Sequence, residues 1–257
     1  MKNLRNILIA LTCLVSSTAF ASMDVAEYER LAGTNVSRCT DPISTAECKV
    51  ELDYGLAQGL ITQRSYDWGV ANGYYPVIDR NDNVRAICKC GCFEADTNIS
   101  VWSKEAQKVV DIAAKDINAQ HQLVALSADA TLSAMTTGDF AIKTLTQGPE
   151  KPALFVFDLE DGTQLKVTQH HGMLLSSGEM VAAKDVNLKQ SFISADSQSP
   201  VKIVNISREF TDKDVFNFET ESDDVASHII VAEGVYVGDL IWQNQLAKDL
   251  GAIAVRK

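Results

Sequence analysis

Hydrophobic and polar residues alternate through most of the chain after residue 92, with the period of two that is typical of half-buried strands. ALFVFDLEDGTQLKVT, residues 153–168, alternates on both sides of Asp161-Gly162, and HIIVAEGVYVGD, residues 228–239, does the same around Glu233-Gly234. Each pattern predicts a β-hairpin. We expect only a short helix, over residues 128–136, to interrupt the strands. The pattern therefore predicts an all-β domain of about 150 residues, which is an ordinary domain size.

The same region contains an internal repeat. AAKDIN at residues 113–118 returns as AAKDVN at residues 182–187, which is 69 residues later. Apolar strings follow each copy in the same order: residues 123–126 with 192–193, 140–143 with 201–204, and 155–160 with 215–220. Two copies are too few for a solenoid. We therefore expect a duplicated β-subdomain with a pseudo-two-fold axis.

Residues 22–91, which we name the leader segment, have a different pattern. Ser44-Thr45-Ala46-Glu47 forms a capping box, and a helix is predicted after it because apolar residues recur at helical spacing. A second short helix is predicted over residues 65–71, ending at Asn72-Gly73. Residues 79–83 alternate oxygen-bearing side chains but lack the Gly and the distal Glu of a calcium loop. We expect a plain turn there.

The first 21 residues are typical of a secretory signal peptide. Lys2 and Arg5 precede an apolar stretch over residues 7–15, and Ala19-Phe20-Ala21 forms a small-x-small cleavage signature. Cleavage after Ala21 would also remove Cys13, and it predicts a secreted or periplasmic protein. The stretch is too short to span a bilayer, and no later segment reaches the roughly 20 apolar residues that a transmembrane helix needs.

Charge and cysteine content narrow the function classes. The net charge of −11 becomes −13 once Lys2 and Arg5 leave with the signal peptide, which argues against nucleic acid as a partner. Five cysteines then remain, an odd number that leaves at least one thiol unpaired within a monomer. The disulfide candidates are Cys39, Cys48, Cys88 and Cys90, with their pairing open, and the fifth is Cys92. No Cys and His spacing fits a zinc site, so no metal or cofactor is expected.

A cysteine nucleophile needs an acid–base partner, usually a histidine that is distant in sequence. His121 lies in a polar stretch and is expected at the surface, and His228 precedes a strand and is expected to be structural. His170 and His171 lie at the end of the predicted strand that contains Leu165 and Val167, and they fall on opposite faces of it. The alternation alone therefore does not select one of these two.

Three motifs occur in a fixed order along the chain: Gly91-Cys92-Phe93, then Thr97-Asn98-Ile99, then Thr168-Gln169-His170-His171. Here the chain resembles the Hint domains of hedgehog proteins and inteins, in which a first-position Cys is followed by a Thr and a strand, and later by a Thr-x-x-His motif. The resemblance covers about residues 91–239 and includes the internal duplication known for that fold. It implies a Hint-type domain over residues 92–239, followed by a tail over residues 240–257.

The resemblance implies that the domain cuts its own chain once, as a single-turnover cysteine autoprotease. Cys92 Sγ would attack the Gly91 carbonyl and convert the Gly91–Cys92 amide into a thioester. His171 would then transfer the proton to the leaving nitrogen, and Thr168 would hold the scissile amide. The substrate is the protein's own leader segment, and glycine at position 91 tolerates the strained backbone that such a bond needs.

Two departures from the family limit this expectation. Splicing inteins end in His-Asn followed by Cys, Ser or Thr, whereas the matching place here reads Gly238-Asp239-Leu240, and Asn244 has no nucleophile after it. The Asp with which hedgehog proteins activate a sterol is absent from residues 143–147. We therefore expect cleavage at Gly91–Cys92 without splicing or sterol attachment, with the thioester resolved by water, a thiol or an amine.

Three other readings of the cysteines and histidines stay open. The first is a Hint-like domain that no longer cuts and serves as a binding or structural module of the cell envelope, with Cys92 in a structural bridge. The second is a conventional Cys/His hydrolase that acts on other chains, which would need a third residue to orient the histidine. Finally, thiol–disulfide exchange between Cys90 and Cys92 would hold the protein inactive until it is reduced.

Overall fold

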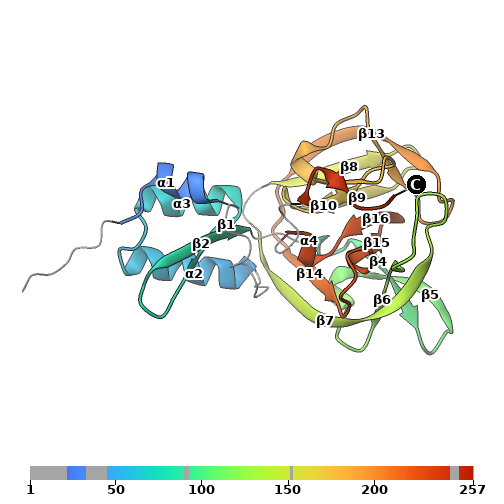
Figure 1. The fold of residues 1–257 in the computed structure, drawn as a ribbon, viewed down its shortest axis with the longest axis horizontal. Coiled ribbons are helices and arrows are strands. Elements are labelled where there is room, and N and C mark those ends of the chain that lie inside the picture. The colour runs from blue at the N-terminus through green and yellow to red at the C-terminus, as the bar shows by residue number, and fades with distance from the viewer. Residues whose placement is uncertain (1–21, 33–44, 90–92, 151–152, 244–248, 257) are drawn as a thin grey trace, which may run out of the picture.

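The chain folds into two parts, which the computed structural model describes over residues 22–32, 45–89, 93–150, 153–243 and 249–256 (Figure 1). The leader segment forms a small unit of helices with one hairpin, and the residues from 93 onward form a large β domain. This confirms the predicted fold class of a β domain preceded by a partly helical, cysteine-containing segment. No helix among the described residues is long and apolar enough to cross a membrane.

Local sequence signals explain the helices of the leader segment. Its described elements are α1 (Val25–Leu31), α2 (Thr45–Ala57), α3 (Gln63–Asn72), β1 (Tyr74–Ile78) and β2 (Val84–Lys89). At the start of α3, Thr62 Oγ1 accepts a hydrogen bond from the Ser65 N–H. At its end, Gly73 takes a left-handed φ of 66°, which glycine adopts without a steric penalty. The stop predicted at residues 72–73 is confirmed.

Asp79 shapes the turn between β1 and β2. Its Oδ1 accepts the backbone N–H of Asn81 at 2.8 Å and that of Asn83 at 3.0 Å, and its Oδ2 forms an ion pair with Arg85. These bonds to its own turn lower the pKa of the Asp79 carboxyl far below its usual range. The plain turn predicted over residues 79–83 is confirmed.

The leader segment has its own hydrophobic core. Tyr28, Ile61 and Ile87 are almost completely buried in it. Cys48 and Cys88 lie in the same core, and both are disulfide-bonded. Cys39 and Cys90 lie outside the described residues, so the disulfide connectivity stays a prediction. A covalently reinforced core of this kind lets a short segment hold one conformation.

The β domain is built on one long, strongly twisted antiparallel sheet. Neighbouring strands follow the order β12-β13-β8-β9-β3-β14-β7-β6-β4-β15-β16-β10-β11-β17, with β5 paired to β4. The strands are β3 (Phe93–Glu94), β4 (Asn98–Ser103), β5 (Lys108–Ala113), β6 (Gln122–Leu126), β7 (Thr137–Pro149), β8 (Leu154–Leu159), β9 (Gln164–Val167), β10 (Gly172–Leu174), β11 (Glu179–Ala182), β12 (Ser191–Ile193), β13 (Pro200–Glu209), β14 (Asp214–Thr220), β15 (Ile229–Ala232), β16 (Val235–Gly238) and β17 (Ala252–Ile253). The hairpins β8–β9 and β15–β16 confirm the two that the sequence predicts.

Backbone hydrogen bonds confirm the internal duplication. In each copy, a short 3-10 helix of sequence Ala-Lys-Asp donates two backbone N–H groups to carbonyls on the segment that opens the copy. The bonds are Ala114 to Thr97 and Lys115 to Ala95 in the first copy, and Ala183 to His171 and Lys184 to Gln169 in the second. They measure 2.8 and 3.0 Å in both copies. The two halves of the domain therefore repeat one local fold as well as one sequence motif.

The two copies meet where β3 pairs with β9. These strands are antiparallel, with Phe93 directly opposite Val167. Each of these two residues also pairs with a residue on the strand at its other side. Phe93 pairs with Phe216 on β14, and Val167 pairs with Phe155 on β8. The opening residues of the first copy thus lie beside the residues that lead into the second copy.

The expected helix over residues 128–136 is absent from the structure, and this prediction is wrong. The segment instead folds back on itself, with Thr131 donating its N–H to the Ala134 carbonyl at 3.0 Å. The Leu132 N–H donates to the carbonyl of Arg256, near the C-terminus, at 2.8 Å. These contacts, together with burial of Met135 in the core, override the helix propensity of an alanine-containing stretch.

Candidate active site

Two of the predicted site residues lie together at the junction of the two copies. Thr168 follows β9 directly, and the chain then turns tightly, with the His171 N–H donating to the Thr168 carbonyl at 3.1 Å. Both side chains are buried: Thr168 is 4% exposed, and His171 is 0% exposed. Gly91 and Cys92 lie outside the described residues. The described part of the site therefore begins at Phe93.

The ring of Phe93 covers the imidazole of His171. The two ring centroids are 4.2 Å apart at an interplanar angle of 61°, and Phe93 in turn packs on Phe218. Phe93 itself is completely buried. An aromatic wall on this side excludes water from the histidine and fixes the plane of its ring.

Burial lowers the pKa of His171 to about 3. The imidazole is therefore neutral at physiological pH and carries a single ring proton. Such a ring accepts a proton through one nitrogen while it donates through the other. Because its protonated form is strongly acidic, it passes a proton on readily to a poor leaving group.

Gln243 holds His171 from the other side. Its Nε2 lies 2.9 Å from His171 Nδ1, and both side chains are buried. Gln243 ends α4 (Leu240–Gln243), a short helix that follows β16 and packs into the domain. A primary amide presents both a donor and an acceptor, so it can hold the ring in either tautomer. No sequence motif pointed to Gln243, because it lies past the end of the recognisable motifs.

His170 belongs to a different contact from His171. Its Nε2 lies 3.1 Å from the carbonyl oxygen of Asn72, in the leader segment, and its ring packs edge-on against Tyr74. Although both histidines are buried, only His171 contacts Phe93. The structure thus separates the two neighbouring histidines that the alternation pattern leaves equivalent.

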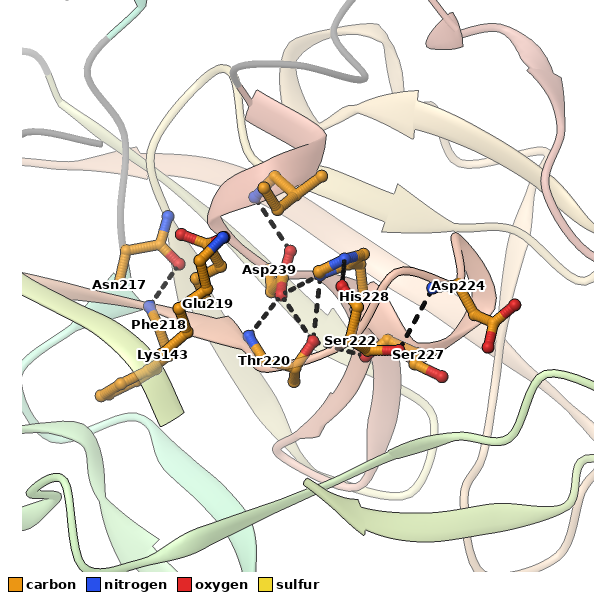
Figure 2. A network of polar contacts seen from close by, with 11 residues as sticks. Lys143, Asn217, Phe218, Glu219, Thr220, Ser222, Asp224, Ser227, His228 and Asp239 are labelled. Carbon is orange, nitrogen blue, oxygen red and sulfur yellow. Dashed lines mark hydrogen bonds and ion pairs between the residues drawn. The ribbon is translucent and has the colours of Figure 1, made fainter. Parts of the chain in front are cut away.

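A second buried polar cluster lies at the end of β16, around Asp239 (Figure 2). Asp239 Oδ2 accepts the Thr220 N–H at 2.9 Å and lies 2.8 Å from His228 Nδ1, and Oδ1 accepts the Ile241 N–H at 2.9 Å. Asp239 has no exposed surface. Its carboxylate is therefore occupied by donors on both oxygens.

The surroundings of His228 favour its charged form. Nδ1 faces the Asp239 carboxylate, and Nε2 faces the Ser222 carbonyl at 3.1 Å, so both nitrogens meet acceptors (Figure 2). Burial opposes the charge, but the hydrogen bond and negative charge of Asp239 outweigh it and raise the pKa of His228. His228 is a structural residue of this ion pair, in line with the role the sequence predicts for it.

No group of three or more His, Cys, Asp or Glu side chains that could hold a metal ion occurs among the described residues. Among the described side chains of the site, His171 offers a ring nitrogen and Thr168 a hydroxyl.

Comparisons with known proteins give structural matches only. No protein-family profile and no curated protein matches the chain. Similar solved structures include a DnaB intein from Synechocystis, with 19% identity and a TM-score of 0.47, covering 58% of this chain and 98% of the intein. A bacterial intein-like domain from Clostridium thermocellum has 17% identity and a TM-score of 0.46, covering 58% and 98%. An intein from a hyperthermophile has 17% identity and a TM-score of 0.47, covering 58% and 99%.

Proposed function

We propose that this is an exported autoprocessing protein, whose β domain cuts the Gly91–Cys92 bond of its own chain without splicing. Cys92 is the nucleophile, His171 transfers the proton, and Thr168 orients the scissile amide. The substrate is the protein's own leader segment. The observation that carries the proposal is the packing of Phe93 against His171, with 4.2 Å between ring centroids.

Chain connectivity links this contact to Cys92. Cys92 is bonded to Phe93, and consecutive Cα atoms lie about 3.8 Å apart. Cys92 precedes Phe93 and Thr168 follows Val167, and Phe93 and Val167 are opposite each other. This register supports a nucleophile within reach of Thr168 and His171.

The reaction is an N-to-S acyl shift. Cys92 Sγ attacks the Gly91 carbonyl carbon, a C–S bond forms, and the C–N bond of the amide breaks. The thiol proton ends on the nitrogen of Cys92, which becomes a free amine. An amine is a poor leaving group until its nitrogen is protonated, so a positioned proton carrier has to act during C–N cleavage.

The environment of His171 suits that transfer. A pKa lowered to about 3 makes the neutral ring a weak base towards the thiol, but it makes the protonated ring a strong acid, so the role that this environment favours is donation of the proton to the leaving nitrogen. The aromatic wall of Phe93 and the amide of Gln243 fix the ring, so little reorganisation is needed during the reaction.

The thioester is resolved by water, a thiol or an amine, and no ligation follows. Splicing would need a terminal side chain that is free to attack its own backbone. Asp239, at the matching place, is buried in an ion pair with His228, with donors on both of its carboxylate oxygens. This supports cleavage alone as the outcome.

Two features support the exported location. The first 21 residues have the basic start, apolar stretch and small-x-small end of a signal peptide. Cys48 and Cys88 are disulfide-bonded, and disulfides persist in oxidising compartments such as the periplasm or the cell exterior. The protein thus acts outside the reducing cytosol.

The test is the intact mass of the purified protein beside its Cys92→Ala variant, each with and without dithiothreitol and hydroxylamine. The expected result is a fragment that ends at Gly91, which is absent in the variant and increases with either reagent. A rate of cleavage that is independent of protein concentration would establish an intramolecular cut. A chain that stays intact under all conditions would overturn the proposal.

A non-cleaving binding or structural module is the second candidate. It is favoured by the contact between Gln243 and His171, because that contact occupies one nitrogen of the proposed proton carrier. The intact-mass experiment separates the two candidates. A conventional hydrolase would instead cut an added protein repeatedly, and it would do so after its own chain had been processed.

A further inference from the structure

The turn that carries the proposed catalytic pair also holds the leader segment. Between Thr168 and His171 stand Gln169 and His170, and both contact one oxygen of the leader segment. Gln169 Nε2 donates to the Asn72 carbonyl at 2.6 Å, and His170 Nε2 lies 3.1 Å from the same oxygen. Because a carbonyl only accepts, His170 carries its proton on Nε2 in this contact.

The Asn72 carbonyl is available because α3 ends there. The last carbonyls of a helix have no partner within the helix, and they lie at the negative end of its dipole. Gly73, in the left-handed conformation, turns the chain away, and its N–H bonds back to Gly69. The helix end is thereby presented to two donors from the β domain, one of them on the 2%-exposed side chain of His170.

A row of aromatic rings extends the contact into the leader core. His170 packs edge-on against Tyr74 with 4.9 Å between ring centroids, Tyr74 packs on Trp68 at 5.4 Å, and Trp68 meets Tyr28 edge-on at 5.9 Å. Tyr28 is completely buried. The β domain therefore contacts the leader segment at Tyr74, next to the hydrophobic core of that segment.

The leader segment is suited to dock as a unit. Gly69 shows how tightly it is packed, because a Cβ there would lie 2.8 Å from both a Leu52 methyl and the Tyr74 carbonyl. Helix α2 also lies against β7 of the β domain, so the contact at Asn72 is not isolated (Figure 1). These contacts do not depend on the bond between residues 91 and 92.

We propose that Gln169 and His170 form a docking surface for the leader segment, and that the leader stays bound to the β domain after the chain is cut. The cut itself rests on the proposed function, whereas the docking does not. The product is then a two-chain complex instead of a released leader. Before the cut, the same contact ties the leader segment to the turn that bears Thr168 and His171.

The experiment uses the full chain with Cys92→Ala, so that no self-cleavage occurs, and with a recognition site for a specific protease inserted between residues 91 and 92. All four disulfide-candidate cysteines then remain on the leader side of the cut, and non-reducing electrophoresis verifies that no disulfide joins the fragments. After protease treatment, the two fragments are expected to elute together in size-exclusion chromatography. Fragments that separate in this parent would overturn the docking, whatever the fate of self-cleavage in the unmodified chain.

Variants test the two donors. In the same cleavable background, His170→Ala removes a hydrogen bond and an aromatic contact, and it should raise the dissociation constant of the nicked complex about tenfold to hundredfold. Gln169 is only half-buried, so we expect Gln169→Ala to fold normally. This variant should raise the dissociation constant about tenfold. His121→Ala removes a histidine of the other copy, whose Nδ1 accepts the Asn118 N–H, and it should leave the dissociation constant unchanged. Dissociation constants that stay at the parent value in both His170→Ala and Gln169→Ala would overturn the assignment.

Discussion

Phe93 and His171 pack edge to face in the centre of the β domain, and neither side chain has any exposed surface. They belong to different copies of the internal repeat, which meet through the pairing of β3 with β9. One contact therefore joins the start of the domain, next to Cys92, to the histidine of the Thr-x-x-His motif. The same contact removes water from the imidazole and so contributes to its low pKa.

Replacing the histidine should stop cleavage. His171→Ala removes the side chain proposed to protonate the leaving nitrogen, and the cleavage rate should fall by about 10²–10⁴-fold. The measurement is the time course of the fragment that ends at Gly91, followed by intact mass. His121→Ala is the matched control, since it removes a histidine remote from the site. Cleavage of His171→Ala at the unmodified rate would assign proton transfer to another group.

The protonation state of His171 should stay constant over the physiological range. A folded-state pKa of about 3 keeps the ring neutral, so its ¹⁵N chemical shifts should not change between about pH 5 and 8. Free histidine in the same tube, with a pKa of about 6.5, serves as the titrating reference. The Cys92→Ala chain is used so that the sample stays intact. A His171 titration near the reference value would mean that water reaches the ring.

The depressed pKa of His171 also sets the sign of a stability effect. A lowered folded-state pKa contributes stability that is fully present above the unfolded value of about 6.5 and is lost as the pH falls toward about 3. Acidification should therefore destabilise Cys92→Ala more than Cys92→Ala/His171→Phe, which has no ring to protonate. Urea unfolding at several acidic pH values gives the comparison. An equal loss in both chains would remove His171 as a source of acid sensitivity.

Gln243 should matter to the rate through the orientation of His171. Gln243→Leu keeps the approximate volume and removes the 2.9 Å contact with Nδ1, so the ring loses its fixed plane. Misplacing a catalytic group by a small distance costs up to about 10²-fold in rate, and we expect a loss of tenfold to hundredfold. Gln164→Leu, at the exposed first residue of β9, is the control. A faster cut in Gln243→Leu would show instead that the amide restrains the histidine.

Much of the fold was predictable because its signals are local. The turns at Asp161-Gly162 and Glu233-Gly234 specify hairpins by themselves, since their residues suit the left-handed or tight backbone of such turns. Thr62 and Gly73 likewise determine where α3 starts and ends. The repeat was also predictable from the sequence, because the Ala-Lys-Asp motif occurs in both copies. Each motif makes the same pair of backbone hydrogen bonds in the structure.

The parts that were missed depend on contacts between distant segments. Residues 128–136 do not form the predicted helix, because their backbone bonds elsewhere. The Leu132 N–H, for example, donates to the Arg256 carbonyl in the C-terminal region. Gln243 reaches His171 across 72 residues of sequence, and no local pattern encodes that distance. The alternation of buried and exposed positions could not distinguish His170 from His171, because both side chains are buried. They differ only in their neighbours, which are Tyr74 for His170 and Phe93 for His171.

The ion pair of His228 with Asp239 should make the β domain less stable as the pH rises. A raised folded-state pKa contributes stability that is fully present below the unfolded value of about 6.5 and is lost as the pH passes through the folded value. Losing the proton of His228 leaves the Asp239 carboxylate buried without its charged partner. We therefore expect the urea midpoint of the Cys92→Ala chain to fall between about pH 6 and 9.

His228→Gln isolates this contribution, because glutamine can still donate one hydrogen bond but carries no charge at any pH. The difference in unfolding free energy between Cys92→Ala and Cys92→Ala/His228→Gln should be largest at about pH 6 and should shrink as the pH rises. Asp239→Ala breaks the pair from the other side, and it should cost about 3–5 kcal/mol because it leaves His228 buried without the carboxylate that favours its charged form. A parent-to-variant difference that does not change with pH would mean that His228 is neutral in the folded protein. In that case, Asp239 would be held by the Thr220 and Ile241 backbone N–H groups without a counter-charge.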